Sequence, residues 1–166
     1  VLDKTGTITN GRPEVTDVIP LGGLDAAAMV RIAASVEKNS EHPLAQAIVE
    51  YAVRQGAALP EPERFIARPG YGVEAMVESK EVLLGTRKLL REKGIDYEGA
   101  LAYMERLEEQ GKTVMLIAFD QTVAGLIAVA DTVKDSSAAA VAELKELGLE
   151  VWMITGDNER AARAIA

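Results

Sequence analysis

The chain has 166 residues, of which 48% are hydrophobic and 27% charged, with a formal net charge of −8 at pH 7. This composition is ordinary for a globular protein with one or two small domains, and the acidic balance argues against a nucleic-acid partner, which requires clustered Lys and Arg. The chain has no cysteine, which excludes disulfides and thiolate metal sites.

The first residues predict a reactive loop. Val1-Leu2 has the character of the end of a buried strand, and Asp3-Lys4-Thr5-Gly6-Thr7 follows it. A carboxylate at the carboxyl end of such a strand lies where open α/β sheets place their reactive groups. Gly6 allows backbone N–H groups to approach an anion closely. Asp3 in this position can attack a phosphoryl group and carry it as an acyl phosphate.

The stretch Asp3-Lys4-Thr5-Gly6-Thr7 resembles the phosphorylation signature of P-type ATPases, which belong to the haloacid dehalogenase-like superfamily. The resemblance implies that Asp3 is the residue phosphorylated by ATP, that Lys4 and Thr5 complete the catalytic loop, and that Asp3 and Thr5 bind Mg²⁺. Related phosphatases carry a second acid two residues after the nucleophile. Thr5 occupies that position and cannot act as an acid or base at neutral pH, so a long-lived acyl phosphate is expected.

The elements that follow the loop are predicted from local signals. Val15 to Leu21 indicates a strand that ends at the turn Gly22-Gly23. Asp25 is a suitable N-cap for a helix over Ala26 to Glu37. A second helix begins at Pro43, the favoured first helical position, and Gly56 ends it.

The middle of the chain predicts an antiparallel sheet. Three short strands are expected at Arg64 to Arg68, Val73 to Glu78 and Val82 to Leu84. In the second of these, apolar residues alternate with Glu74 and Glu78, which predicts a sheet with one face in water. Two helices are expected next, at Arg87 to Lys93 and Tyr97 to Gln110. Two strands follow, at Thr113 to Phe119 and Val123 to Ala130.

The final segment predicts part of a parallel α/β domain. A helix is expected from Lys134 to Leu147, a buried strand from Glu150 to Ile154, and a last helix from about Glu159. The fold class is therefore α/β with α+β: an antiparallel-sheet nucleotide-binding domain with flanking helices, inserted into an incomplete haloacid dehalogenase-like phosphorylation domain. We expect the nucleotide-binding domain at residues 12–124 and the partial phosphorylation domain at residues 1–11 and 125–166.

The single histidine lies in Ser40-Glu41-His42-Pro43-Leu44. A histidine before a helix-opening proline is, by itself, more often a cap or a surface residue than a ligand-binding residue. This stretch, however, resembles the Ser-Glu-His-Pro-Leu motif of heavy-metal-transporting P-type ATPases. That resemblance implies that Glu37 and His42 recognise the adenine ring of ATP.

Other short motifs gain meaning from the same resemblance. Gly70, Gly72 and Gly85 match glycines that line the family's nucleotide site, although Thr86 stands where many members carry asparagine. The tripeptide Thr155-Gly156-Asp157 is similar to the family's second phosphate-binding motif. Asp131 resembles a hinge residue that helps to close the two domains on ATP, and an acid-rich helix start is the alternative interpretation.

The resemblance implies the cytosolic ATP-binding part of a membrane pump that exports a heavy-metal ion, with copper(I) expected and zinc or cadmium the alternative. ATP and Mg²⁺ are the expected cofactors. The expected partners are ATP and the transmembrane, actuator and remaining phosphorylation-domain parts of the same pump, and the chain itself is expected to be a monomer. Two rival functions remain open, a soluble phosphatase of the same superfamily and a non-catalytic nucleotide-binding module.

Overall fold

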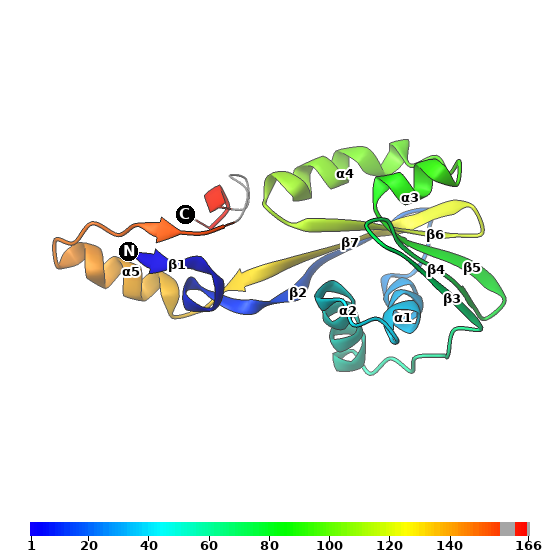
Figure 1. The fold of residues 1–166 in the computed structure, drawn as a ribbon, viewed down its shortest axis with the longest axis horizontal. Coiled ribbons are helices and arrows are strands. Elements are labelled where there is room, and N and C mark those ends of the chain that lie inside the picture. The colour runs from blue at the N-terminus through cyan, green and yellow to red at the C-terminus, as the bar shows by residue number, and fades with distance from the viewer. Residues whose placement is uncertain (157–161, 166) are drawn as a thin grey trace.

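A computed structural model describes residues 1–156 and 162–165 of the chain. The larger of its two sheets is antiparallel and has six strands in the order β2-β7-β6-β5-β4-β3. A second, two-stranded sheet pairs β1 with β8 in parallel. Figure 1 shows the two sheets in different parts of the molecule, joined by the long β2–β7 ribbon. The expected mixture of an antiparallel sheet with a fragment of a parallel α/β domain is confirmed.

Helices cover both faces of the large sheet. On one face lie α1 (Ala26–Glu37) and α2 (Pro43–Arg54), and on the other lie α3 (Arg87–Glu92) and α4 (Glu98–Glu109), as Figure 1 shows. Each face has its own hydrophobic core, the first around Met29 and Ile48 and the second around Leu89 and Leu107. The expectation that one face of this sheet lies in water is therefore wrong for β5, β6 and β7, which α3 and α4 contact, whereas Ile66 of β3 is 36% exposed.

Glu74 shows how a charge is accommodated on that second face. Its side chain is 9% exposed, and Oε2 accepts a 2.6 Å hydrogen bond from Lys93 Nζ, while Oε1 forms an ion pair with Arg68. Burial by itself raises the pKa of Glu74, but the two cations outweigh this effect and hold the pKa below its usual value. At Glu74 the polar position thus marks a partly buried ion-pair cluster rather than a solvated side chain.

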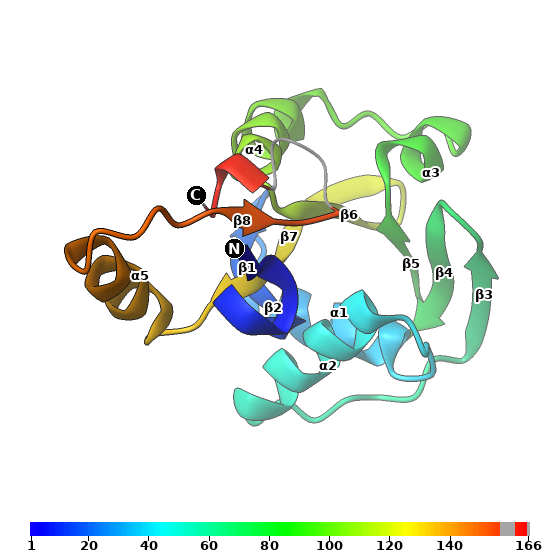
Figure 2. The same ribbon diagram turned by 60° about the vertical axis from the view of Figure 1, so that its left-hand side comes forward.

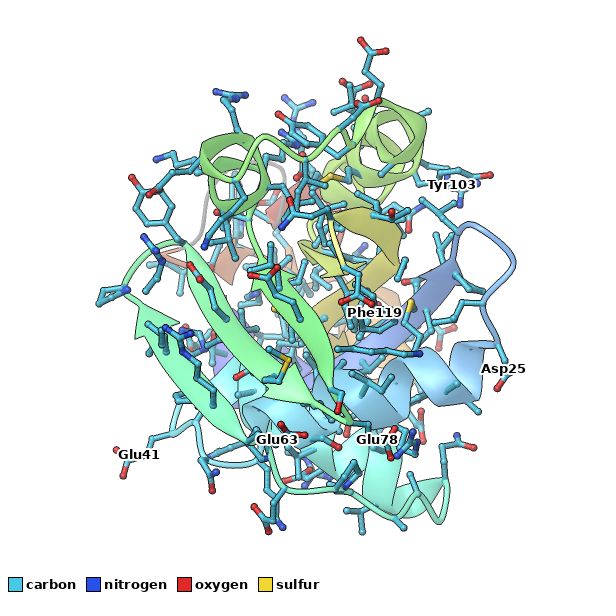
Figure 3. The ribbon with its side chains drawn as sticks, turned by 90° about the vertical axis from the view of Figure 1, so that its right-hand side faces the viewer. Asp25, Glu41, Glu63, Glu78, Tyr103 and Phe119 are labelled. Atoms are coloured by element: carbon cyan, nitrogen blue, oxygen red, sulfur yellow. The ribbon has the colours of Figure 1, made fainter. Side chains whose placement is uncertain are left out.

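The strands in the middle of the chain follow the sequence closely. They are β3 (Arg64–Arg68), β4 (Gly72–Val77), β5 (Lys80–Gly85) and β6 (Thr113–Phe119). The β4–β5 hairpin turns through Glu78 and Ser79, which both have positive φ. Glu78 accepts two hydrogen bonds from Arg31 of α1, at 2.9 and 2.7 Å, and Glu63 accepts one from the Ser79 amide. Figure 3 shows both glutamates at this end of the hairpin, where it meets α1.

Two neighbouring strands of the large sheet, β2 and β7, are longer than their sequences predict. β2 extends over Thr9–Pro20 and β7 over Thr122–Val133. They pair from Thr9↔Val133 to Pro20↔Gly125, with register shifts between Thr9 and Pro13 and between Val15 and Asp17. Cross-strand pairing extends both strands beyond their apolar runs. Both strands cross the expected domain boundaries at residues 11/12 and 124/125, so that division stays a prediction.

The part of the chain predicted to be a partial phosphorylation domain contains β1 (Leu2–Asp3), the loop Lys4–Ile8, α5 (Ser137–Glu146) and β8 (Met153–Ile154). Figure 2 shows β1 alongside β8, with α5 at one end of the pair. The expected buried strand from Glu150 to Ile154 is wrong in length and in burial, since Trp152 and Ile154 are 64% and 60% exposed. Among the described residues β1 is the only strand that pairs with β8, so side chains of β8 remain exposed to solvent. The predicted last helix from Glu159 begins outside the described residues.

Candidate functional site

Asp3 lies at the carboxyl end of β1, as predicted. The parallel pairing aligns Leu2 with Met153 and Asp3 with Ile154, so the loop after Asp3 and the loop after Ile154 emerge at the same edge. The fold therefore brings Asp3, Lys4 and Thr5 to the edge that also carries Thr155 and Gly156. Asp157, the last residue of that predicted motif, lies outside the described residues.

The loop after Asp3 is a tight turn. Thr5 has φ −75° and ψ 118°, and Gly6 has φ 78° and ψ −11°, which is the geometry of a type II β-turn. This turn requires a positive φ at its third position, which glycine adopts without steric cost. Asp3 is exposed to solvent, whereas the next residue, Lys4, is buried and only 7% exposed.

A second group of predicted residues lines a cavity of about 350 Å³ beside the large sheet. Its walls come from the end of α1, the start of α2, the β3–β4 turn, the end of β5 and the start of β6. Five predicted residues contribute to it, namely Glu37, His42, Gly70, Gly72 and Gly85. Cavities of this size and mixed lining suit a small organic ligand.

Glu37 is the chemically distinctive residue of this cavity. It is the last residue of α1 and is 7% exposed, and its Oε2 atom is buried without a hydrogen-bond partner. Burial raises the pKa of Glu37, and the neighbouring Ser40 hydroxyl lowers it by less. A buried acceptor without a partner is rare and costly, and it fits a ligand that brings an N–H donor. The exocyclic amine of adenine is such a donor.

His42 has two roles in the structure. It lines the cavity, and its Nδ1 atom accepts a 3.2 Å hydrogen bond from the Leu44 amide, which makes it the N-cap of α2. Because Nδ1 accepts, the ring proton is assigned to Nε2, which remains available as a donor. The capping role, which the sequence suggested for a histidine before Pro43, is thus present together with a place in the cavity wall.

The three glycines differ in what they allow. A Cβ atom on Gly72 would lie 2.2 Å from the Leu84 carbonyl oxygen, and one on Gly85 would lie 2.1 Å from the Tyr71 carbonyl oxygen. These two glycines are therefore needed because β4 and β5 approach each other closely. Gly70 has φ +77° and no atom within 4 Å of its Cβ position, so it leaves open space at the cavity. The resemblance implied that all three line the nucleotide site, whereas glycines between short strands are by themselves more often turn residues.

Thr86 is a residue whose role the sequence did not reveal. Its amide and its hydroxyl both donate to the Tyr71 carbonyl oxygen, at 2.8 and 3.1 Å. The hydroxyl therefore fixes the Gly70–Gly72 turn.

The residues at Asp3 fit Mg²⁺ in donor type but not in number. Mg²⁺ prefers oxygen ligands in octahedral geometry and usually keeps water or substrate phosphates among them. Asp3 and Thr5 offer oxygen atoms, and no group of three or more Asp, Glu, His or Cys side chains able to hold a metal occurs among the described residues. The nucleotide phosphates and water would have to supply the remaining ligands.

The two groups of residues lie far apart along the fold. Figure 1 shows the Asp3 loop at one end of the β2–β7 ribbon and the helices of the cavity at the other. Asp131, predicted as a hinge residue, lies within β7 of this ribbon and not at the start of a helix. The alternative interpretation of Asp131 as part of an acid-rich helix start is therefore wrong.

Comparison with known sequences identifies relatives over the whole chain. The family model described as haloacid dehalogenase-like hydrolase matches residues 1–166. A copper-exporting P-type ATPase of Bacillus subtilis (strain 168) is 51% identical over all 166 residues of this chain. The chain spans 21% of the length of that relative.

Solved structures match in the same way. A zinc-transporting PIB-type ATPase in the E2.Pi state superimposes with a TM-score of 0.91 and 39% identity, over 98% of this chain and 26% of that one. The catalytic domain of the CPx-ATPase CopB-B, in a structure concerned with conformational changes upon nucleotide binding, matches with a TM-score of 0.66 and 25% identity. That match covers 97% of this chain and 55% of the other.

Proposed function

Because the chain belongs to the haloacid dehalogenase-like hydrolase family and matches P-type ATPases over its whole length, we propose that it is the ATP-binding and phosphorylated part of a heavy-metal pump. The observation that carries ATP binding is the buried, unpartnered Oε2 of Glu37 in the wall of the cavity. This oxygen accepts from the adenine amine, and His42 completes the recognition from the start of α2.

In the proposed reaction the Asp3 carboxylate attacks the γ-phosphoryl group of ATP and displaces ADP. Asp3 becomes an aspartyl phosphate, and the electron pair of the broken bond leaves with the ADP oxygen. Bound Mg²⁺ would neutralise the phosphate charge. Gly70 and the Gly70–Gly72 turn hold the nucleotide at the cavity, while Thr155 and Gly156 lie at the edge where the phosphoryl group arrives.

Thr5 favours a pump over a soluble phosphatase of the same superfamily. It stands where the phosphatases place a second acid, and its hydroxyl cannot activate water at neutral pH. The aspartyl phosphate would therefore persist until other parts of the pump complete the cycle. The remaining phosphorylation-domain, actuator and transmembrane parts are the proposed partners, with this chain on the cytoplasmic side of the membrane. No helix among the described residues is long and apolar enough to span a bilayer.

Copper(I) is the proposed transported ion. The sequence relative reported above is a copper exporter, whereas the zinc-transporting pump supports the alternative ion through its fold. ATPase activity of the complete pump, measured with copper(I) and with zinc, decides between them, and a response to zinc alone would overturn the copper assignment.

Titration calorimetry with ATP tests the nucleotide site. Loss of one good hydrogen-bonding or stacking partner costs about 1–3 kcal/mol, so His42→Ala should weaken ATP binding roughly five- to hundredfold. Asp3→Asn should leave the affinity nearly unchanged, because Asp3 lies at the other end of the ribbon. Unchanged affinity in a folded His42→Ala chain would leave His42 only its role as the cap of α2.

A further inference from the structure

The turn between β3 and β4, residues 68–71, forms part of the cavity wall and is closed by one backbone hydrogen bond. The Tyr71 amide donates to the Arg68 carbonyl oxygen at 2.9 Å, and Gly70, which follows Pro69, has φ +77°. Proline followed by a glycine of positive φ is typical of a type II β-turn. Because one such hydrogen bond contributes only about 1 kcal/mol, contacts outside the turn decide how completely it is formed.

The first residue of this turn is fixed on the far side of the sheet. Arg68 lines the cavity, but its guanidinium forms ion pairs with Glu74 and, at 3.2 Å, with Glu92. Glu74 lies on the face opposite the α1–α2 core, because its neighbours Val73 and Ala75 belong to that core. Two carboxylates from different elements therefore hold the arginine at which the turn begins.

The last residue of the turn is fixed by the beginning of α3. The amide and the hydroxyl of Thr86 both donate to the Tyr71 carbonyl oxygen. Thr86 is the N-cap of α3, yet its side chain makes no capping hydrogen bond to the helix. An N-cap threonine normally accepts a hydrogen bond from an amide in the first turn of its helix. Here the hydroxyl holds the β3–β4 turn instead.

The short helix α3 connects these two contacts. It begins after Thr86 and ends at Glu92, a partner of Arg68. The next residue, Lys93, donates to Glu74 at 2.6 Å. A helix of this length is not stable by itself, so its position depends on such contacts. The two ends of α3 are thus tied to the two ends of the turn, on the face of the sheet opposite α1 and α2 (Figure 1).

We propose that Arg68, fixed by Glu74 and Glu92, is a positioning residue for the nucleotide cavity. It holds the start of the β3–β4 turn from the opposite face of the sheet and keeps the cavity wall in its binding geometry before the nucleotide arrives. The apparent affinity for ATP then falls in proportion to any loss of the pre-formed population. This role rests on the proposed function, since it concerns the same nucleotide site, and it gives Arg68 no contact with ATP.

The test compares Arg68→Met, which keeps the aliphatic stem and removes the charge, with Arg64→Met. Arg64 is the matched control, because it lies in the same strand and forms no ion pair or side-chain hydrogen bond with any residue that the structure describes. Both substitutions remove one positive charge, so a difference between them cannot arise from long-range attraction to ATP. Calorimetry measures the ATP affinity of each variant, and NMR measures the hydrogen exchange of its Tyr71 amide.

Arg68→Met should weaken ATP binding roughly three- to tenfold, as expected if the pre-formed fraction falls to between a third and a tenth. The exchange rate of the Tyr71 amide should rise by at least the same factor, whereas that of Leu126, in a central strand, should not change. Arg68→Lys should recover part of both losses, because an ammonium group lacks the fork that reaches two carboxylates. Arg64→Met should stay within about twofold of the wild type, since its exposed charge is screened.

Glu74→Gln separates this role from a direct contact between Arg68 and a phosphate of ATP. If Arg68 positions the turn, loss of the Glu74 charge should weaken ATP binding, as Arg68→Met does. If Arg68 instead binds a phosphate, its release from Glu74 should leave the ATP affinity unchanged or raise it. Either of these two results would overturn the proposal.

Unchanged ATP affinity in a folded Arg68→Met chain would overturn it as well, because a purely structural role speeds exchange throughout the sheet, Leu126 included, without weakening binding to the folded chain. If Arg68→Met does not fold, Glu92→Gln serves instead, since Glu92 is a half-exposed partner whose loss should act in the same direction with a smaller effect. No change in either quantity in that variant would also overturn the proposal. A wild-type chain that binds no ATP would refute the proposed function, whereas the Tyr71 exchange would still show whether the ion pairs hold the turn.

Discussion

The substitution Glu37→Met should strengthen the fold and weaken ATP binding at the same time. Glu37 is 7% exposed and its Oε2 atom has no hydrogen-bond partner, and such a buried acceptor costs about 1–3 kcal/mol. Methionine is similarly long and unbranched, and it removes this cost together with the smaller benefit of the Ser40 hydroxyl. We therefore expect the free energy of unfolding at pH 7 to rise by about 1 kcal/mol.

The stability gained by Glu37→Met should depend on pH, because the pKa of Glu37 differs between the folded and unfolded states. Burial raises the pKa of Glu37 above its usual value of 4.5. A carboxyl group with a raised pKa in the folded state contributes stability below its unfolded pKa and loses that contribution as the pH rises through the folded pKa. The stability advantage of Glu37→Met should therefore be small near pH 4 and should grow until the pH exceeds the raised pKa. Urea unfolding at a series of pH values measures it.

The effect on binding has the opposite sign. Without an acceptor for the adenine amine, Glu37→Met should bind ATP about five- to hundredfold more weakly by calorimetry at pH 7. Wild-type affinity should also fall as the pH decreases through the raised pKa of Glu37, because a protonated carboxyl is a poorer acceptor, and the variant should lose this component.

Glu41→Met is the matched control for Glu37→Met. Glu41 is exposed on the α1–α2 connection, where Figure 3 shows it pointing away from the molecule, and its replacement should change neither stability nor ATP affinity appreciably. Glu37→Met that binds ATP like the wild type would refute adenine recognition by Glu37. A loss of more than about 1 kcal/mol in stability would refute the argument that its buried oxygen is a cost.

Three further predictions concern the glycines, the buried ion pairs and turnover. Gly72→Ala should lower the free energy of unfolding by more than about 3 kcal/mol because its Cβ atom would lie 2.2 Å from a carbonyl oxygen, whereas Gly70→Ala should cost only about 1–2 kcal/mol for its positive φ; equal losses in thermal unfolding would contradict the geometry. The pKa of Glu74 is lowered from its usual value of 4.5, so this residue stabilises the fold above pH 4.5, and the stabilisation disappears as the pH falls through the folded pKa. Glu74→Gln should therefore destabilise the chain at pH 7 and much less at pH 3. An equal loss of stability at both pH values would contradict this argument. The 166-residue chain should bind ATP without turnover, since Asp3 and Thr5 alone leave Mg²⁺ short of ligands; sustained phosphate release that Asp3→Asn abolishes would contradict this.

Local signals in the sequence predicted most of the elements correctly. Asp25 caps α1 through the Ala28 amide, and Pro43 begins α2, where the sequence placed both. The limits of β3 and β6 also agree, because short apolar runs between turn residues define them. Glu37 and His42 were found through a motif and lie in one cavity, although their binding role stays a prediction. Each of these features depends on residues that are close together in the chain.

Contacts between distant residues decided the rest. Thr9 and Asp131 are 122 positions apart, and no local pattern in the sequence indicates that one carboxylate holds both the bulge of β2 and the hydroxyl behind the phosphorylation loop. Glu74 was expected in water because its neighbours alternate, yet it is paired with Lys93, at the end of α3, and with Arg68. Hydrophobic periodicity states which side chains share a face of a strand, but which face is covered, and by which charges, depends on where the later helices pack.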